Sequence, residues 1–191
     1  MSKPVTLYLV RHGQATGSIE DDPDPGLNDL GRAQAEAAAR ELAPLGPMPL
    51  ITSPMRRTRE TADAFLKHWG REARVEPRVS EIGFPTTKLE ERRAWLMEIM
   101  AGRWSDPAAQ STPGVDLNAW RAGVIDALKE IPESSVITSH FVAINVVVGH
   151  LLGDDLVIKF RPDNCSVTIV ERVGDELRLV EMGREAETVI Q

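Results

Sequence analysis

A histidine and an arginine stand together near the start of this chain, in a place where side chains often do chemistry. Arg11 and His12 directly follow the apolar run Val5–Val10, and Gly13 comes next. A histidine just after such a run can be a structural residue, a metal ligand or a nucleophile. Its residue type alone favours the structural role, because buried imidazoles commonly satisfy nearby backbone groups. The surroundings of His12 therefore have to decide its role.

Arg57 and His140 occupy comparable places further along the chain. Arg57 lies in the first turns of a helix that we predict to begin at Ser53-Pro54, because serine caps helices and proline suits the first helical position. His140 follows a second apolar run, Val136-Ile137-Thr138. Neighbouring cations repel one another unless an anion joins them. A phosphoryl group fits, since guanidinium groups match its oxygens and a helix N-terminus favours negative charge.

A metal site is the competing interpretation, and the sequence gives it little support. The chain has four histidines and one cysteine, without the His-Glu-x-x-His or Cys-x-x-Cys spacing of metal sites. We interpret His68 as a surface residue and His150 as a core residue. We therefore expect neither metal ligands nor a cofactor at the site.

The candidate residues must be positioned by strands that alternate with helices. Strands are expected near residues 5–10, 50–52, 73–75, 136–138, 166–171 and 177–181, and helices near 29–42 (capped by Asn28), 54–69, 89–100, 115–131 and 141–152 (ended by Gly153). This alternation predicts a three-layer α/β/α sandwich with a largely parallel central sheet, as one domain over residues 1–191. Ligands lie beyond the carboxyl ends of the strands in such folds. His12, Arg57 and His140 should therefore meet at one edge.

Composition limits the function classes. The chain has 191 residues, a net charge of -7 and a pI of about 5.2, which argues against nucleic-acid and anionic-membrane partners. Cys165 has no partner for an intrachain disulfide, and the first residues lack the pattern of a signal peptide. We expect a cytoplasmic protein that acts on a small phosphorylated metabolite. A homodimer is compatible with the sequence.

Several segments together resemble the histidine phosphatase superfamily, which includes cofactor-dependent phosphoglycerate mutase. The similar segments are Leu9-Val10-Arg11-His12-Gly13-Gln14, residues 27–35, Ser53-Pro54-Met55-Arg56-Arg57-Thr58-Arg59-Glu60-Thr61-Ala62, Val136-Ile137-Thr138-Ser139-His140, and Asn164-Cys165-Ser166-Val167-Thr168. The resemblance extends from about residue 5 to residue 171. Each motif is weak alone, but their number and order make the resemblance specific.

The resemblance implies a phosphoglycerate mutase-like fold and a phosphatase mechanism. His12 would be the nucleophile that forms a phosphohistidine, while Arg11, Arg57 and His140 would stabilise the charged oxygens, with no Mg²⁺ needed. The position of the family's general acid and base is Glu81. A solvated loop glutamate is the alternative interpretation of that residue, because glutamates are mostly exposed.

The sequence departs from the family pattern around the expected substrate rather than at the phosphoryl centre. Phe141-Val142 follows the second histidine in place of Gly-Gly, residues 84–87 replace the usual segment after Glu81, and Ser18 stands where asparagine is common. We expect Gln14, Ser18 and Phe141 to contact the substrate together with Arg11 and Arg57. The departures weaken any statement about the particular phosphoester more than one about the reaction class.

Hydrolysis of a small phosphomonoester is the leading functional interpretation. Phosphoglycerate mutase-type transfer is the first alternative, but a chain of 191 residues has little room for segments that keep water from a phosphoenzyme. A phosphohistidine-protein phosphatase is a second alternative, although that branch lacks the carboxylic acid. A catalytically silent phosphate-binding module is the alternative from a different class.

Overall fold

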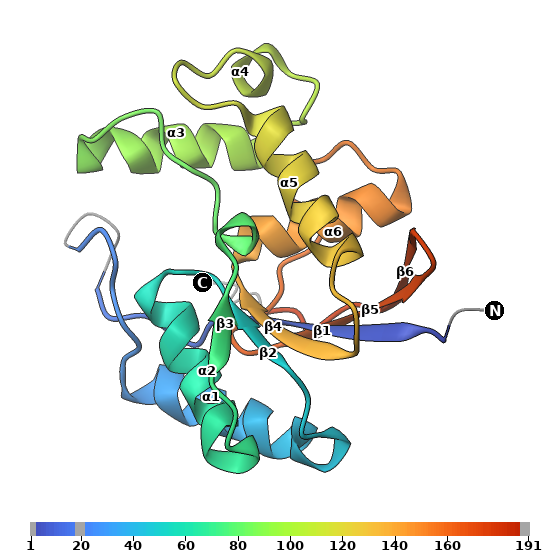
Figure 1. Cartoon of the computed structure of the whole chain (residues 1–191). Helices are drawn as coiled ribbons and strands as arrows, with labels where there is room; N and C mark the ends of the chain where they lie inside the picture. The colour runs from blue at the N-terminus through green and yellow to red at the C-terminus, as the bar shows by residue number, and fades with distance from the viewer. Residues whose placement is uncertain (1–2, 18–21, 188–191) are drawn as a thin grey trace.

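A mixed six-stranded sheet lies between two layers of helices (Figure 1). The computed structural model describes residues 3–17 and 22–187. The strands are β1 (Val5–Arg11), β2 (Leu50–Thr52), β3 (Ala73–Val75), β4 (Ser135–Ser139), β5 (Val167–Val173) and β6 (Glu176–Glu181). The helices are α1 (Asp29–Leu42), α2 (Arg56–Trp69), α3 (Leu89–Ala101), α4 (Pro107–Gln110), α5 (Leu117–Lys129) and α6 (Phe141–Leu152), with short 3₁₀ helices at Ala43–Leu45 and Pro77–Val79.

The strand order is β3-β2-β4-β1-β5-β6. Strands β3, β2, β4 and β1 run parallel to one another, whereas β5 pairs antiparallel with β1, and β6 with β5. The β5–β6 hairpin turns at Gly174, whose φ of 61° suits glycine. The predicted α/β fold with a largely parallel sheet is thus confirmed, and the strands expected from apolar runs are present.

Both faces of the sheet are covered, which explains the nearly continuous apolarity of its central strands. Leu7 and Leu9 of β1 and Ile137 of β4 pack into the core on the α5 and α6 side. Val10 of β1 and Val136 of β4 point the other way, into the core formed with α1 and α2. Figure 1 shows α1 and α2 below the sheet and α5 and α6 above it.

Local signals at two helix ends agree with the structure, and a third does not. Asn28 caps α1 by accepting a hydrogen bond from the Gly31 amide at 2.8 Å, and Gly153 ends α6 with a φ of 63°. The prediction that α2 begins at Ser53-Pro54 was wrong, since the helix begins at Arg56 after an extended Met55. The Ser53 hydroxyl contacts the side chains of His140 and Thr58 at 2.7 Å, closer than the Met55 amide at 3.3 Å.

Helices α3 and α4 form a cap over the α5 side of the molecule, where Figure 1 shows α3 projecting beyond the sheet. This region joins the main core through buried Ile99 and Trp104, while Met97 on α3 is exposed. Phe84, before α3, packs edge-on against Trp95 with ring centroids 5.9 Å apart. Within the described ranges, no helix is long and apolar enough to cross a membrane.

Candidate active site

The parallel pair of strands β1 and β4 places His12 and His140 side by side. Arg11 and Ser139 are register partners at the carboxyl ends of these strands, and the His12 amide donates to the Ser139 carbonyl at 3.0 Å. His140 follows immediately and is the residue that precedes α6, with a side chain that makes no capping hydrogen bond. The imidazole centroids of His12 and His140 are consequently only 5.3 Å apart, with a 63° angle between the rings.

Arg57 lies between the two histidines. Its Nε donates to Nε2 of His12 at 3.2 Å, and its Nη2 lies 3.2 Å from Nδ1 of His140. The residue is 8% exposed and comes from the first turn of α2. The two imidazoles can accept hydrogen bonds from this buried guanidinium through their lone pairs. They do not neutralise its positive charge, because neither ring is negatively charged.

The hydrogen bonds of His12 fix its reactive nitrogen. Nδ1 lies 2.8 Å from the Gly13 carbonyl, which can only accept, so Nδ1 carries the hydrogen. Nε2 therefore keeps its lone pair and faces Arg57. Burial first, and the charge of Arg57 second, lower the pKa of His12 to about 3. The imidazole is neutral at physiological pH, which is the form that can attack an electrophile.

His140 is held by a relay of hydroxyl groups at the start of α2. Its Nδ1 accepts from Arg57, so Nε2 carries the hydrogen and donates to the Ser53 hydroxyl at 2.7 Å. Ser53 contacts the Thr58 hydroxyl at 2.7 Å, and Thr58 donates to the Met55 carbonyl at 2.7 Å. Burial, followed by the neighbouring cationic groups, lowers the pKa of His140 well below its usual value. This ring is neutral as well.

Arg11 contributes the second guanidinium. Its Nη1 donates to the Pro162 carbonyl at 2.9 Å, and its guanidinium carbon lies 5.0 Å from the centroid of Phe141. Its buried Nε finds no acceptor among the described residues. Buried donors are nearly always paired. The free donor therefore suits an anionic oxygen brought by a ligand.

Glu81 lies at the N-terminus of α6, beside His140. Its Oε1 accepts from the amides of Ile82, Val142 and Ala143 at 3.1 to 3.2 Å, and its Oε2 accepts from Val142 at 3.1 Å. Burial raises the pKa of this carboxyl group, against the opposing effect of these amides and of Arg57. The interpretation of Glu81 as a solvated loop residue was wrong.

Two residues at this edge were not found from the sequence. The Asp24 carboxylate accepts from the Arg56 amide at 2.8 Å and lies 4.0 Å from Nη1 of Arg57, so it supports the start of α2. The Asn164 side chain donates to the His12 carbonyl at 2.9 Å and so helps to fix the backbone at His12. Asn164 belongs to a motif already noted, whereas no local pattern marks Asp24.

The remaining predicted residues have different surroundings. Phe141 is half-buried next to Arg11. Gln14 is exposed, and its Oε1 accepts from Asn28 at 3.0 Å. Ser18 lies outside the described residues. The placement of His150 in the core was wrong, since it is exposed on α6, while His68 is at the surface as expected.

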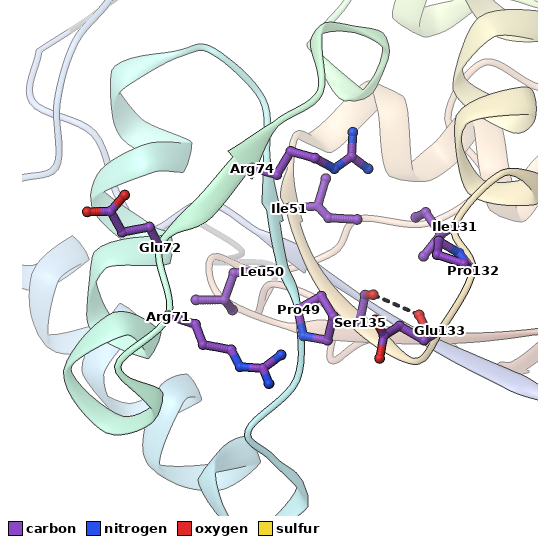
Figure 2. Close-up of a pocket in the computed structure, with 10 residues that line it drawn as sticks. All are labelled: Pro49, Leu50, Ile51, Arg71, Glu72, Arg74, Ile131, Pro132, Glu133 and Ser135. Atoms are coloured by element: carbon purple, nitrogen blue, oxygen red, sulfur yellow. Dashed lines mark hydrogen bonds between the residues drawn. The ribbon is translucent and has the colours of Figure 1, made fainter.

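A separate hollow of about 450 Å³ lies at the opposite, amino-terminal edge of β2 and β4 (Figure 2). Its lining includes Arg71, Arg74 and Glu133. Neither His12 nor His140, the two histidines of the cluster formed with Arg11, Arg57 and Glu81, is part of it. His12, Arg57 and His140 thus lie together at the other, carboxyl edge. In the described part of the chain, no group of three or more His, Cys, Asp or Glu residues is arranged to hold a metal ion.

The comparison with protein families matches residues 7–185 to the histidine phosphatase superfamily, branch 1. The chain belongs to the histidine phosphatase superfamily. The match covers every residue of the cluster, from Arg11 to Asn164. The resemblance noted in the motifs is therefore confirmed.

One relative among curated proteins is the probable phosphoglycerate mutase GpmB of Cronobacter sakazakii, 27% identical over 180 residues that cover 86% of this chain and 84% of the relative. Among solved structures, YhfR of Bacillus stearothermophilus has a TM-score of 0.76 at 20% identity, with 91% and 94% of the two chains covered. A mycobacterial glucosyl-3-phosphoglycerate phosphatase in complex with inorganic phosphate has a TM-score of 0.70 at 22% identity, covering 95% and 98%. The structural likeness supports the histidine phosphatase fold.

Proposed function

We propose that this histidine phosphatase is a metal-independent hydrolase of small phosphomonoesters that works through a phosphohistidine on His12. The observation that carries the proposal is the position of Arg57, whose guanidinium contacts both His12 and His140. A phosphoryl group that enters between these side chains accepts the hydrogens of Arg57 and frees Nε2 of His12 for attack. Arg11 supplies a further free donor to the same anion.

In the first step, Nε2 of His12 attacks phosphorus and the ester P–O bond breaks. The leaving alkoxide takes a proton from Glu81, whose burial favours the protonated carboxyl group at rest. Positive charge from Arg11 and Arg57 stabilises the equatorial oxygens during transfer. His140 gains a proton at Nδ1 when the dianion binds, because the added negative charge offsets the burial that holds its pKa down.

In the second step, water attacks phosphorus and gives its proton to the Glu81 carboxylate. The P–N bond then breaks, inorganic phosphate leaves, and His12 recovers its lone pair. The amides of Val142 and Ala143 stabilise the carboxylate form of Glu81 that acts as base in this step. One carboxyl group therefore serves both halves of the reaction.

Hydrolysis of p-nitrophenyl phosphate tests the proposal. We expect turnover that EDTA does not reduce, loss of that turnover in His12→Ala, and an acid-labile phosphoenzyme in rapidly quenched samples of the wild type. His68→Ala is the control, since it removes an exposed histidine outside the cluster. Activity that EDTA abolishes and Zn²⁺ restores would contradict the proposed mechanism.

A phosphoglycerate mutase-type transfer is the second candidate, favoured by the GpmB relatives. The same phosphohistidine would then pass its phosphoryl group to a second hydroxyl rather than to water. The two are separated by trapping the phosphoenzyme and adding glycerate phosphates. Phosphate release at a rate independent of the acceptor supports hydrolysis, whereas recovery of the label in an isomeric phosphoester supports the mutase.

A further inference from the structure

We propose that Arg161 binds a second anionic group of the substrate, a carboxylate or a second phosphate carried by the leaving group. The inference rests on the proposed function, because it assumes that a phosphoester occupies the Arg11–Arg57 pocket. The substrate class would be phosphomonoesters with two anionic ends, and Arg161 would bind the end that is not transferred.

The first observation is that Phe141 joins Arg161 to the phosphate site. The guanidinium carbon of Arg11 lies 5.0 Å from the Phe141 centroid, and that of Arg161 lies 6.0 Å from the same centroid. Phe141 directly follows His140 and is half-buried. Arg161 and Arg11 therefore contact the same aromatic ring, and Arg11 is one of the residues that we assign to the transferred phosphate. A guanidinium that rests on a ring still presents its N–H edge to a ligand.

The second observation is that the backbone before Arg161 is fixed to the first turn of α6. Asn145 on α6 is fully buried, and its Oδ1 accepts from the amides of Lys159 and Phe160 at 2.7 and 3.0 Å. Its Nδ2 donates to the Phe141 carbonyl at 3.0 Å. Through these hydrogen bonds, the buried Asn145 side chain fixes the distance between Phe141 and the backbone of Lys159 and Phe160.

The backbone at Arg161 and beyond is held as well. The Arg161 amide donates to the Glu185 side chain at 2.9 Å, and its carbonyl accepts from the Ala186 amide at 2.9 Å. The next carbonyl, of Pro162, accepts from Arg11. Arg161 thus projects from a rigid segment, so a ligand that it binds need not order the backbone first.

The third observation is that Arg161 is exposed and forms no ion pair with any described residue. Nearby Arg184 forms an ion pair with Asp163 at 3.1 Å, but no carboxylate among the described residues lies within ion-pair distance of Arg161. Glu185 is used by the Arg161 amide instead. An exposed arginine is often only solvated. Arg161 differs from such a residue because its backbone is fixed, its guanidinium lies over Phe141, and Arg11 contacts the same ring.

Three substrates of equal chain length test the inference: 3-hydroxypropyl phosphate, 2-carboxyethyl phosphate and 1,3-propanediol bisphosphate. We expect the wild type to favour the two doubly anionic compounds in kcat/KM by about five- to tenfold, the size of a partly exposed charge-assisted contact. Arg161→Gln should abolish this preference without changing turnover of 3-hydroxypropyl phosphate, and Arg161→Lys should keep part of it. Comparison of 2-carboxyethyl phosphate with 1,3-propanediol bisphosphate shows whether Arg161 prefers a carboxylate or a second phosphate.

Arg71→Gln is the matched control, because it removes the same charge from an exposed arginine at the opposite edge of the sheet (Figure 2). Binding of propylphosphonate and 2-carboxyethylphosphonate, measured by calorimetry, gives the same comparison without turnover. A preference that survives Arg161→Gln, or an equal loss for all three substrates, would overturn the inference. Failure of the wild type to hydrolyse any of the three while the binding preference depends on Arg161 would overturn the hydrolase proposal alone.

Discussion

The Nε hydrogen of Arg57 points at Nε2 of His12 across 3.2 Å, so the proposed nucleophile and its main cation are hydrogen-bonded to each other before substrate arrives. This contact uses the lone pair that must attack phosphorus. An entering phosphate competes for the guanidinium and thereby releases the nitrogen. Binding and activation of the nucleophile are in this way parts of one event.

Arg57→Lys is expected to lower kcat by about 10²- to 10³-fold, the usual effect of losing one donor to a transition-state oxyanion. Lysine keeps the charge but cannot reach His12 and His140 with separate nitrogens. Steady-state kinetics with p-nitrophenyl phosphate measures the effect, and Arg59→Lys on the exposed side of the same helix is the control. A loss confined to KM would contradict a role in the transition state.

The stability of the protein should fall in acid partly because of His12. Its folded pKa of about 3 lies below the value of about 6.5 in an unfolded chain. Below pH 6.5 the unfolded state therefore binds a proton that the folded state does not. The contribution is fully present above pH 6.5 and is lost as the pH falls toward 3.

Urea unfolding at pH 7.5 and pH 4.5 measures this effect. We expect wild type to lose up to about 2 to 3 kcal/mol more than His12→Gln between these pH values, from the shift in proton affinity. His140 remains in both proteins and contributes in the same direction. Equal losses in the two proteins would show that His12 is not held neutral by the fold.

Glu81→Gln should affect poor leaving groups more than good ones. An alkyl phosphate needs a proton on its leaving oxygen, so we expect kcat to fall by roughly 10²-fold or more for it and clearly less for p-nitrophenyl phosphate. Glu133→Gln, at the remote hollow of Figure 2, is the matched control. An equal loss for both substrates would instead indicate that Glu81 acts by supporting the start of α6.

Gly31 couples α1 to the loop that carries His12. A Cβ on Gly31 would lie 2.1 Å from the Gln14 carbonyl oxygen, and one on Gly13 would lie 2.4 Å from the Gly31 carbonyl oxygen. Gly31→Ala should therefore push the two backbones apart, lowering both the melting temperature and kcat.

Gly123→Ala is the control for this substitution. It lies within α5, where a Cβ would come no closer than 3.9 Å to Arg78, and should stabilise the protein by about 0.5 to 1 kcal/mol through helix propensity. Thermal unfolding of both variants provides the comparison. Unchanged activity in Gly31→Ala would show that the loop can move without disturbing His12.

Much of the fold was predictable because its signals are local. Covered strands show apolar runs, and Asn28 and Gly153 mark helix ends by their own side-chain or backbone properties. The meeting of His12 and His140 followed from the general rule for carboxyl ends of parallel strands. Glu81 came from family resemblance, since its contacts with α6 join positions about sixty residues apart.

Other features depend on side chains that approach from distant segments. Ser53 looked like a helix cap, but its hydroxyl binds His140, 87 positions away, and α2 begins later. Asp24 accepts from the first amide of α2 and Asn145 from the Lys159 amide, and both contacts join segments far apart in the sequence, which no periodicity encodes. His150 was misplaced because the apolar sequence around it hides which side of α6 faces solvent.

The ladder between β1 and β4 has an evolutionary consequence. Backbone hydrogen bonds of these two strands set the spacing of His12 and His140, and the α3–α4 cap takes no part in them. The α3–α4 cap can therefore diverge, or be exchanged by an engineer, while the two histidines keep their spacing. The segment after Arg161 is less free to change, because Pro162 and Asn164 contact Arg11 and His12. Changes in the α3–α4 cap would then alter the substrate without replacing the residues of the proposed mechanism.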